Sequence, residues 1–245
     1  MEGFSYSDIF ATKGVEYLVI IAFLVLLPLF WFLLNKRASI AGRIHESVGV
    51  LTAKILRIPQ GIFFSGNHTW MFLEQNGAVR VGLDDLLLHI TGKVKFTYLH
   101  NPGEPILKGG LLSEIDQNGK LLRIYSPVSG KIMETNHILN DSNGLLNDDP
   151  YGKGWIYKIK PSYWREESKA CYVAEEATKW SEKELQRFKD FLSRTMENFT
   201  PETAMIIMQD GGELCDHSLS VLPGEIWQDF QKEFLNPNRM KMTEV

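Results

Sequence analysis

The triplet Cys215-Asp216-His217 brings a thiol, a carboxylate and an imidazole together within three residues. These side chains can bind zinc, but a structural zinc ion needs four ligands, and no second cluster lies nearby in the sequence. The other cysteine, Cys171, is distant and forms neither a CxxC pair nor a disulfide framework with Cys215. We therefore predict no metal site and interpret the triplet as part of a loop.

Two further patterns could do chemistry but are more simply structural. Gly152-Lys153-Gly154 lacks the GxxxxGK[ST] frame of a phosphate loop and reads as a turn. Asp84-Asp85 precedes the short apolar run LLLHI, so we expect Asp84 to cap one or two helical turns. No Ser-His-Asp, paired-carboxylate or dinucleotide-binding pattern stands out. The sequence thus predicts no catalytic residue, and we expect a protein that is not an enzyme.

A lysine follows a predicted turn in the stretch SEIDQNGKLLRIYSPVSGK, residues 113–131. Asn118-Gly119 lies between two β-rich runs, and Asn-Gly is the strongest local signal for a type I′ hairpin turn. Asn76-Gly77 and Asn143-Gly144 mark other turns. Lys120 would begin the returning strand, where a lone lysine is most often a solvated, passive charge.

Residues 124–161 carry a specific resemblance. The matching residues are Tyr125-Ser126-Pro127-Val128-Ser129-Gly130, Asn136, Leu146-Asn147-Asp148-Asp149-Pro150-Tyr151-Gly152, Gly154-Trp155 and Lys158-Ile159-Lys160-Pro161, preceded more weakly by His68-Thr69-Trp70, Val81-Gly82-Leu83, Asp85 and Gly92-Lys93-Val94. This pattern resembles the H protein of the glycine cleavage system, a member of the lipoyl-domain group. The resemblance implies a β barrel-sandwich hybrid, in which a hairpin-tip lysine carries a lipoyl group that shuttles an aminomethyl group.

The lipoyl-lysine motif of that family is altered in this sequence. Counted without gaps between Gly92 and Gly130, the family's glutamate falls on Asp116 and its lysine on Gly119, so Lys120 comes one residue late. One step along a strand turns a side chain to the opposite face. We therefore predict that the lipoyl group is absent and that no cofactor is bound. The alternative is a lipoyl carrier that uses Lys120.

The N-terminal part contains an uncharged apolar run, Tyr17 to Leu34. As a helix its 18 residues would rise about 27 Å, close to the hydrocarbon thickness of a bilayer. More basic residues follow the run than precede it, so the positive-inside rule places the C-terminal part in the cytoplasm and the N-terminus outside. We expect a single-pass protein of a bacterial inner membrane. The net charge of -4 gives no reason to expect a nucleic-acid partner.

The rest of the chain divides by pattern into a connector, a β module and a helical tail. We predict an N-terminal segment with the membrane helix at 1–37, a connector at 38–60, the H-like domain at 61–161 and an α-rich extension at 162–245. In the extension, Ser181-Glu182-Lys183-Glu184 reads as a capping box that opens a helix. Its apolar stripe is Leu185, Phe188, Leu192, Met196 and Phe199, and a second helix begins at Pro223 with Ile226, Trp227, Phe230 and Phe234 on one side.

These observations together favour a membrane-anchored accessory protein. The fold class is mainly β with α, preceded by one transmembrane helix and followed by a small α-rich extension. The hypothesis is a structural subunit without lipoylation that binds the bilayer through Tyr17–Leu34 and docks unidentified protein partners of a membrane complex. The alternative is a membrane-tethered lipoyl carrier that serves an aminomethyl-transferring or redox enzyme through Lys120.

Overall fold

A computed structural model describes residues 17–28, 30, 49–141, 144–196, 208–209 and 213–238 of the chain. The chain forms two compact units, Met1–Val48 and Gly49–Val245. In the first unit, residues 17–28 are helical and their side chains are exposed. Within the described residues, no helix is both long enough and apolar enough to cross a membrane. Residues 29 and 31–34 of the predicted span lie outside the described residues, as does Asn143 of the third predicted turn.

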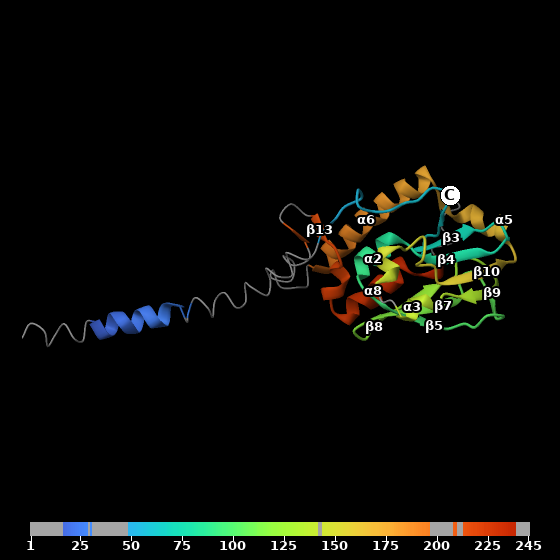
Figure 1. Cartoon of the computed structure of the whole chain (residues 1–245). Helices are drawn as coiled ribbons and strands as arrows, with labels where there is room; N and C mark the ends of the chain where they lie inside the picture. Colours follow the sequence, from blue (N-terminus) through green and yellow to red (C-terminus); the bar gives the residue numbers. More distant parts are fainter. Residues whose placement is uncertain are drawn as a thin grey trace, which may run out of the picture. The chain divides into compact units, whose positions relative to one another are not determined.

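The second unit is built mainly from antiparallel strands, drawn in Figure 1. One sheet has the order β11-β2-β3-β4-β10-β9-β6, a second β5-β7-β8 and a third β1-β13-β12. The strands are β1 Val50–Leu51, β2 Phe63–Phe64, β3 Thr69–Leu73, β4 Val79–Leu83, β5 Lys95–Tyr98, β6 Pro105–Ile106, β7 Leu111–Gln117, β8 Lys120–Tyr125, β9 Gly130–Thr135, β10 Tyr157–Pro161, β11 Tyr172–Val173, β12 Met208–Gln209 and β13 Glu213–Cys215. The prediction of a mainly β module is confirmed.

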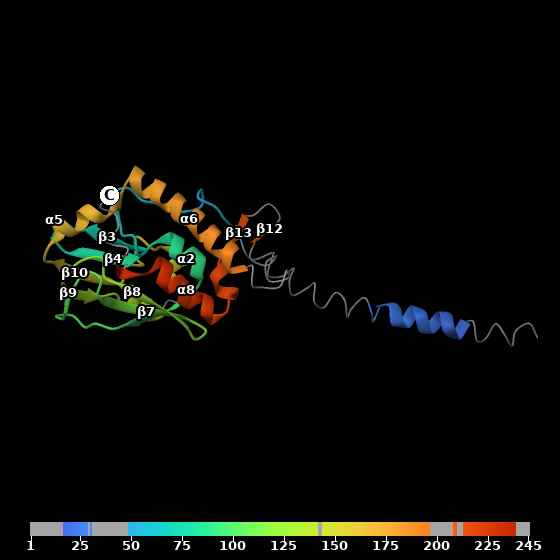
Figure 2. The ribbon, with the colours of Figure 1, turned by 180° about the vertical axis from the view of Figure 1, so that it is seen from behind.

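Helices lie at the ends and over one face of these sheets, as Figures 1 and 2 show from opposite sides. They are α2 Asp85–Thr91, α3 Ile138–Asp141, α4 Leu145–Asp148, α5 Trp164–Glu167, α6 Glu175–Met196 and α8 Gly224–Phe234, with 3-10 turns η1 Ser168–Ala170 and η2 Ser218–Val221. The cap of α2 is as predicted, because Asp84 Oδ1 accepts a hydrogen bond of 2.8 Å from the Leu87 amide. Pro223 is the N-cap of α8, which confirms the predicted start of that helix.

One apolar core runs through the β module and the helical tail. Val81 and Ile159 of the seven-stranded sheet, Ile115 of the smaller sheet and Phe188 and Phe230 of the two long helices all belong to it. Among the residues that the structure describes, every core residue comes from Leu51 or later, so this unit has its own hydrophobic core. The tail therefore packs on the module. The predicted boundary between the H-like domain and the α-rich extension, at residues 161 and 162, stays a prediction.

The start of α6 differs from the prediction. The helix begins at Glu175, and the proposed capping residues Ser181 and Glu184 lie buried within it. Ser181 Oγ has no hydrogen-bond partner, so it does not cap a helix end. The extra N-terminal turns are held by Trp180, whose ring stacks on Tyr172 at 5.1 Å. Leu185, Phe188 and Leu192 are buried as the predicted stripe requires; the side chain of Met196 and the whole of Phe199 lie outside the described residues.

The loop before β9 is held by an acidic side chain from α5. Glu167 accepts hydrogen bonds from the Ser129 amide at 2.7 Å and from the Ser129 hydroxyl at 2.6 Å. Gly130 follows, and a Cβ added there would lie 2.2 Å from the Lys160 carbonyl oxygen. Only glycine allows this approach of β9 to β10. The Ser129-Gly130 pair of the sequence motif is therefore structural.

Candidate functional site

The β7–β8 hairpin ends in the tight turn that the sequence predicts. Asn118 and Gly119 both have positive φ angles, 54° and 85°, as a type I′ turn requires. Asp116 braces the turn, because its Oδ2 accepts a hydrogen bond of 3.0 Å from the Gly119 amide. A Cβ built on Gly119 would meet nothing within 4 Å. The tip thus faces open space, and the residue at the tip has no side chain that could carry a group.

Lys120 lies one residue beyond the tip and reaches into the C-terminal extension. Its Nζ donates hydrogen bonds to the carbonyl oxygens of Ser220, at 2.8 Å, and Leu222, at 2.7 Å. The same ammonium lies 5.6 Å from the centre of the Trp227 ring. Partial burial lowers the pKa of Lys120 from its usual value. The prediction of a solvated, passive lysine is therefore wrong, because this amine joins the hairpin to the segment before α8.

A second contact attaches α8 to the outer edge of the same strand. The side-chain oxygen of Gln231 accepts a hydrogen bond of 2.6 Å from the Arg123 amide, and its NH₂ group donates one of 3.2 Å to the Arg123 carbonyl. β8 is an edge strand of its sheet, and an unpaired edge is a template for further strands. One glutamine side chain thus supplies the two hydrogen bonds that a neighbouring strand would make at this position. We call the contacts of Lys120 and Gln231 the hairpin clamp.

A buried ionic cluster connects the family-like histidine to α6. His68 is fully buried, and its Nδ1 lies 2.8 Å from Asp84 Oδ2 while its Nε2 lies 3.6 Å from Glu184 Oε2. Burial alone would lower the pKa of His68, but the two carboxylates outweigh this effect and raise the pKa to about 9. The imidazole is therefore protonated at neutral pH. It acts as a buried cation between the module and the helical tail.

The sequence gives only part of this cluster. His68 matches the family pattern and Asp84 is a predicted cap, but Glu184 is assigned by its spacing to a capping box. Its true position in mid-helix directs the carboxylate inward, where it also pairs with Arg187 at 3.1 Å. One feature of the sequence could have indicated that Glu184 faces inward. Glu184 lies on the apolar side of the predicted helix, directly before Leu185.

The other sequence candidates are structural. Cys215 is buried in β13, and Asp216 pairs with His89 Nδ1 at 2.9 Å, an interaction that the sequence does not reveal. No group of three potential metal ligands occurs in the parts of the chain that the structure describes. Gly152 and Lys153 donate their amides to the Asp149 carboxylate at 3.0 and 2.9 Å, which confirms a turn in place of a phosphate loop.

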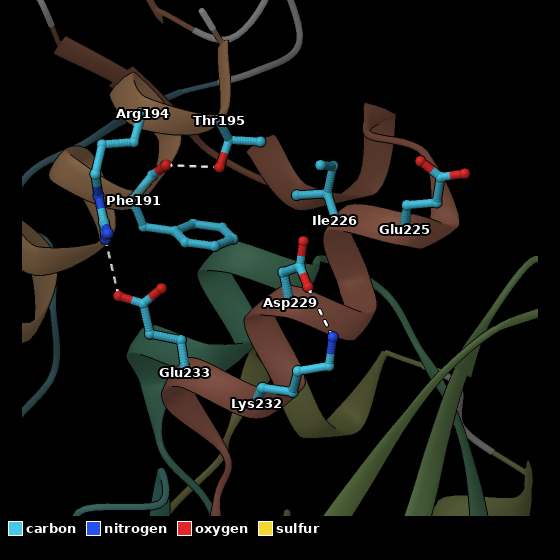
Figure 3. A pocket seen from close by; sticks show the side chains of 8 residues that line it. All are labelled: Phe191, Arg194, Thr195, Glu225, Ile226, Asp229, Lys232 and Glu233. Atoms are coloured by element: carbon cyan, nitrogen blue, oxygen red, sulfur yellow. Dashed lines mark hydrogen bonds and ion pairs between the residues drawn. The ribbon is translucent and has the colours of Figure 1, made fainter. Parts of the chain in front are cut away.

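A groove of about 630 Å³ lies between α6 and α8 and is shown in Figure 3. Phe191 and Ile226 lie among charged side chains at its rim. Four of the five charged side chains are already paired, since Arg194 contacts Glu233 at 2.9 Å and Lys232 contacts Asp229 at 3.0 Å, which leaves Glu225. The groove therefore presents no converging set of free polar groups for a small ligand. The hairpin remains the part of the molecule where residue type and geometry bear most directly on function.

The similarity to known proteins covers the β module and the beginning of the helical tail. The sequence model described as "Glycine cleavage H-protein" matches residues 62–184, half of the chain. A probable glycine cleavage system H protein of Thermococcus gammatolerans is 36% identical over 126 residues, covering 51% of this chain and 93% of that protein. The H protein of Corynebacterium jeikeium is 32% identical over 106 residues, covering 42% of this chain and 84% of its own.

A solved H-protein structure, from Mycobacterium marinum, is similar to part of the chain. It has 28% sequence identity and a TM-score of 0.41, and the match covers 43% of this chain and 87% of that one. The sequence matches carry the assignment, because they span nearly the full length of the relatives. This chain belongs to the glycine cleavage H-protein family.

Proposed function

We propose that this protein is a family member without lipoylation, which acts as an accessory subunit and binds partner proteins at a membrane complex. Members of the family are lipoyl carrier proteins and not enzymes themselves. A carrier needs an exposed lysine on its hairpin for the attached arm to move. What this chain retains of the carrier is the scaffold and the turn.

The single observation that carries the proposal is that the amine of Lys120, beside the hairpin turn, is hydrogen-bonded to the extension. Gly119 occupies the tip, and the Lys120 ammonium donates to two main-chain carbonyl oxygens of the extension. Acylation would replace the charged amine by a neutral amide, which carries one N–H instead of three. It would also place a long chain where Ser220 and Leu222 now lie. Lipoylation and the hairpin clamp therefore compete for the same nitrogen.

Intact-mass spectrometry tests this proposal directly. The purified chain would be incubated with a lipoate ligase, ATP and lipoate, beside an authentic H protein as the positive control. We expect the control to gain one lipoyl group and this chain to gain none. A lipoyl adduct mapped to Lys120 by peptide sequencing, and absent from the Lys120→Arg variant, would refute the proposal.

A lipoyl carrier that uses Lys120 is the second candidate function. One observation favours it: Lys120 is the lysine adjacent to the turn, and its lowered pKa increases the share of nucleophilic free amine. This function predicts that Lys120→Arg abolishes turnover of a partner enzyme while Lys95→Arg, on the exposed face of β5, does not. Equal turnover of both variants would exclude Lys120 as a carrier.

Membrane attachment through Tyr17–Leu34 is supported by the character of its described part. Residues 17–28 form a helix whose side chains are exposed, among them Tyr17, Phe23 and Leu26. Transfer of such apolar surface from water into a bilayer is favourable by about 25 cal/mol for each Å². We expect the full chain to stay in the membrane fraction after an alkaline carbonate wash, and residues 49–245 to be released. Release of the full chain by the wash would contradict the anchor.

The expected orientation places residues 49–245 in the cytoplasm of a bacterial cell, with the N-terminus outside. A C-terminal alkaline phosphatase fusion should then be inactive, and a C-terminal fluorescent protein fusion should be bright. The reverse result would overturn the orientation without affecting the anchor itself.

A further inference from the structure

Exposed apolar side chains and lysines gather at one end of the second unit. Leu107 and Tyr163 are 72% and 62% exposed, the highest values among the large apolar side chains described in residues 49–238. Both lie beside Ser129, because Ser129 Oγ accepts from the Lys108 amide and Ser129 O accepts from the Ser162 amide. β9, β10 and α5 meet at this end, away from β13, in both Figure 1 and Figure 2.

Two lysines face each other on the outer side of the sheet at the same end. Lys131 of β9 and Lys160 of β10 are partners in the strand register, and both are exposed. Residues directly opposite on neighbouring antiparallel strands have Cβ atoms about 4.5–5.5 Å apart, and like charges there destabilise the sheet. Neither lysine has an ion-pair partner among the described residues, so none of those residues offsets this repulsion through an ion pair.

Further basic residues surround this pair. Lys108 lies next to Leu107, and the α5–η1 turn adds the exposed residues Arg165 and Lys169. One exposed acid, Glu166, lies on the same turn. Glu167 keeps its negative charge, because its hydrogen-bond donors on Ser129 are neutral, but the five basic residues named here outnumber these two acids. We call the surface made by Leu107, Lys108, Lys131, Lys160 and Tyr163 the basic end.

We propose that the basic end is a binding surface for an anionic lipid bilayer. Exposed lysines attract negatively charged headgroups, while the apolar side chain of Leu107 and the ring of Tyr163 insert at the interface and the tyrosine hydroxyl stays in water. Four of the five basic residues named here are lysines. Lysine is depleted in protein–protein interfaces, whereas arginine is enriched, so the composition favours headgroups over an acidic protein. The proposal does not depend on the N-terminal anchor.

The test uses residues 49–245, which have their own core and lack the proposed anchor. Co-sedimentation would be measured with vesicles of phosphatidylcholine alone and with vesicles containing phosphatidylglycerol. We expect binding to the anionic vesicles only, weakened by raising the salt concentration. Lys131→Gln/Lys160→Gln should weaken binding by about 25-fold, from about fivefold for each charge. The matched control Lys93→Gln/Lys95→Gln removes two exposed lysines from elsewhere and should change binding less than about twofold.

Leu107→Ser/Tyr163→Ser should leave weak, fully salt-sensitive binding, because the apolar contribution is lost. Circular dichroism would establish that each variant is folded. Equal binding to neutral and anionic vesicles, or an equal loss in the Lys93/Lys95 control, would overturn the proposal. Absence of binding to anionic vesicles would also overturn it. In that case, saturable, Lys131-dependent binding of a poly-glutamate peptide would assign the surface to an acidic protein.

Discussion

Replacing Lys120 by methionine separates a structural amine from a carrier amine. Methionine retains most of the apolar stem beside Trp227 but removes the two hydrogen bonds to the Ser220 and Leu222 carbonyl oxygens. A hydrogen bond to a charged group contributes about 1.5–3 kcal/mol net. The lower end applies here because the Lys120 side chain is only partly buried. Two bonds then give a loss of about 3 kcal/mol in the free energy of unfolding.

The assays are urea denaturation and thermal melting of residues 49–245, each monitored by tryptophan fluorescence and by circular dichroism. For a domain of this size, about 1 kcal/mol lowers the melting temperature by about 2–4 °C, so Lys120→Met should melt about 6–12 °C lower. Lys95→Met removes an exposed lysine of the same sheet and should change stability by no more than about 0.5 kcal/mol.

The two functions predict different results for this variant. A carrier lysine has to be free to swing, so its removal abolishes transfer and leaves stability unchanged. Removal of a clamp lysine instead lowers stability and abolishes no transfer. If Lys120→Met and Lys95→Met have the same free energy of unfolding within about 0.5 kcal/mol, the structural account of Lys120 is refuted.

Three further predictions test other parts of the structure. Gln231→Ala should increase amide hydrogen exchange at Arg123 and cost about 1–2 kcal/mol, because the Arg123 amide loses its partner; unchanged exchange at Arg123 would contradict the edge contact. Gly130→Ala should prevent folding, since its Cβ would lie 2.2 Å from the Lys160 carbonyl oxygen, whereas Gly119→Ala should cost only about 1–2 kcal/mol for its positive φ in open space; similar melting temperatures for both would refute this difference. The pKa of His68 is raised to about 9, so the folded state holds a proton that the unfolded chain releases near pH 6.5. Stability should therefore be full below about pH 6.5 and fall as the pH rises through about 9, with a smaller slope in His68→Gln; an equal slope in that variant would exclude His68 as its source.

The hairpin and the short helix α2 could be predicted from sequence because their causes are local. The Asn118-Gly119 turn needs two positive φ angles, and those two residue types supply them. Asp84 caps α2 through an amide only three residues away. In such elements the deciding contacts lie within a few positions of the chain, so one sequence is enough.

The start of α6 and the surroundings of Lys120 depend on contacts that are distant in sequence. Ser181 and Glu184 fit a capping box, but Trp180 packs on Tyr172 and extends the helix in the N-terminal direction. Lys120 and Leu222 are 102 positions apart. The sequence Asp-Gln-Asn-Gly-Lys does not indicate that a hydrogen-bond acceptor for the lysine lies so far along the chain. Whether the amine of Lys120 is free therefore depends on the tertiary structure.

The chemistry of the hairpin amine connects the docked extension to the proposed absence of lipoylation. A lipoyl ligase needs the free amine within reach, so η2 and α8 would have to leave β8 before Lys120 could be modified. That step breaks the two Lys120 hydrogen bonds and exposes the β8 edge that Gln231 covers. After acylation the neutral amide could not restore both bonds. The docked extension and a lipoyl arm at this position are therefore mutually exclusive states. Because the core of the unit is shared between the module and α8, the docked state is the one that the whole fold favours.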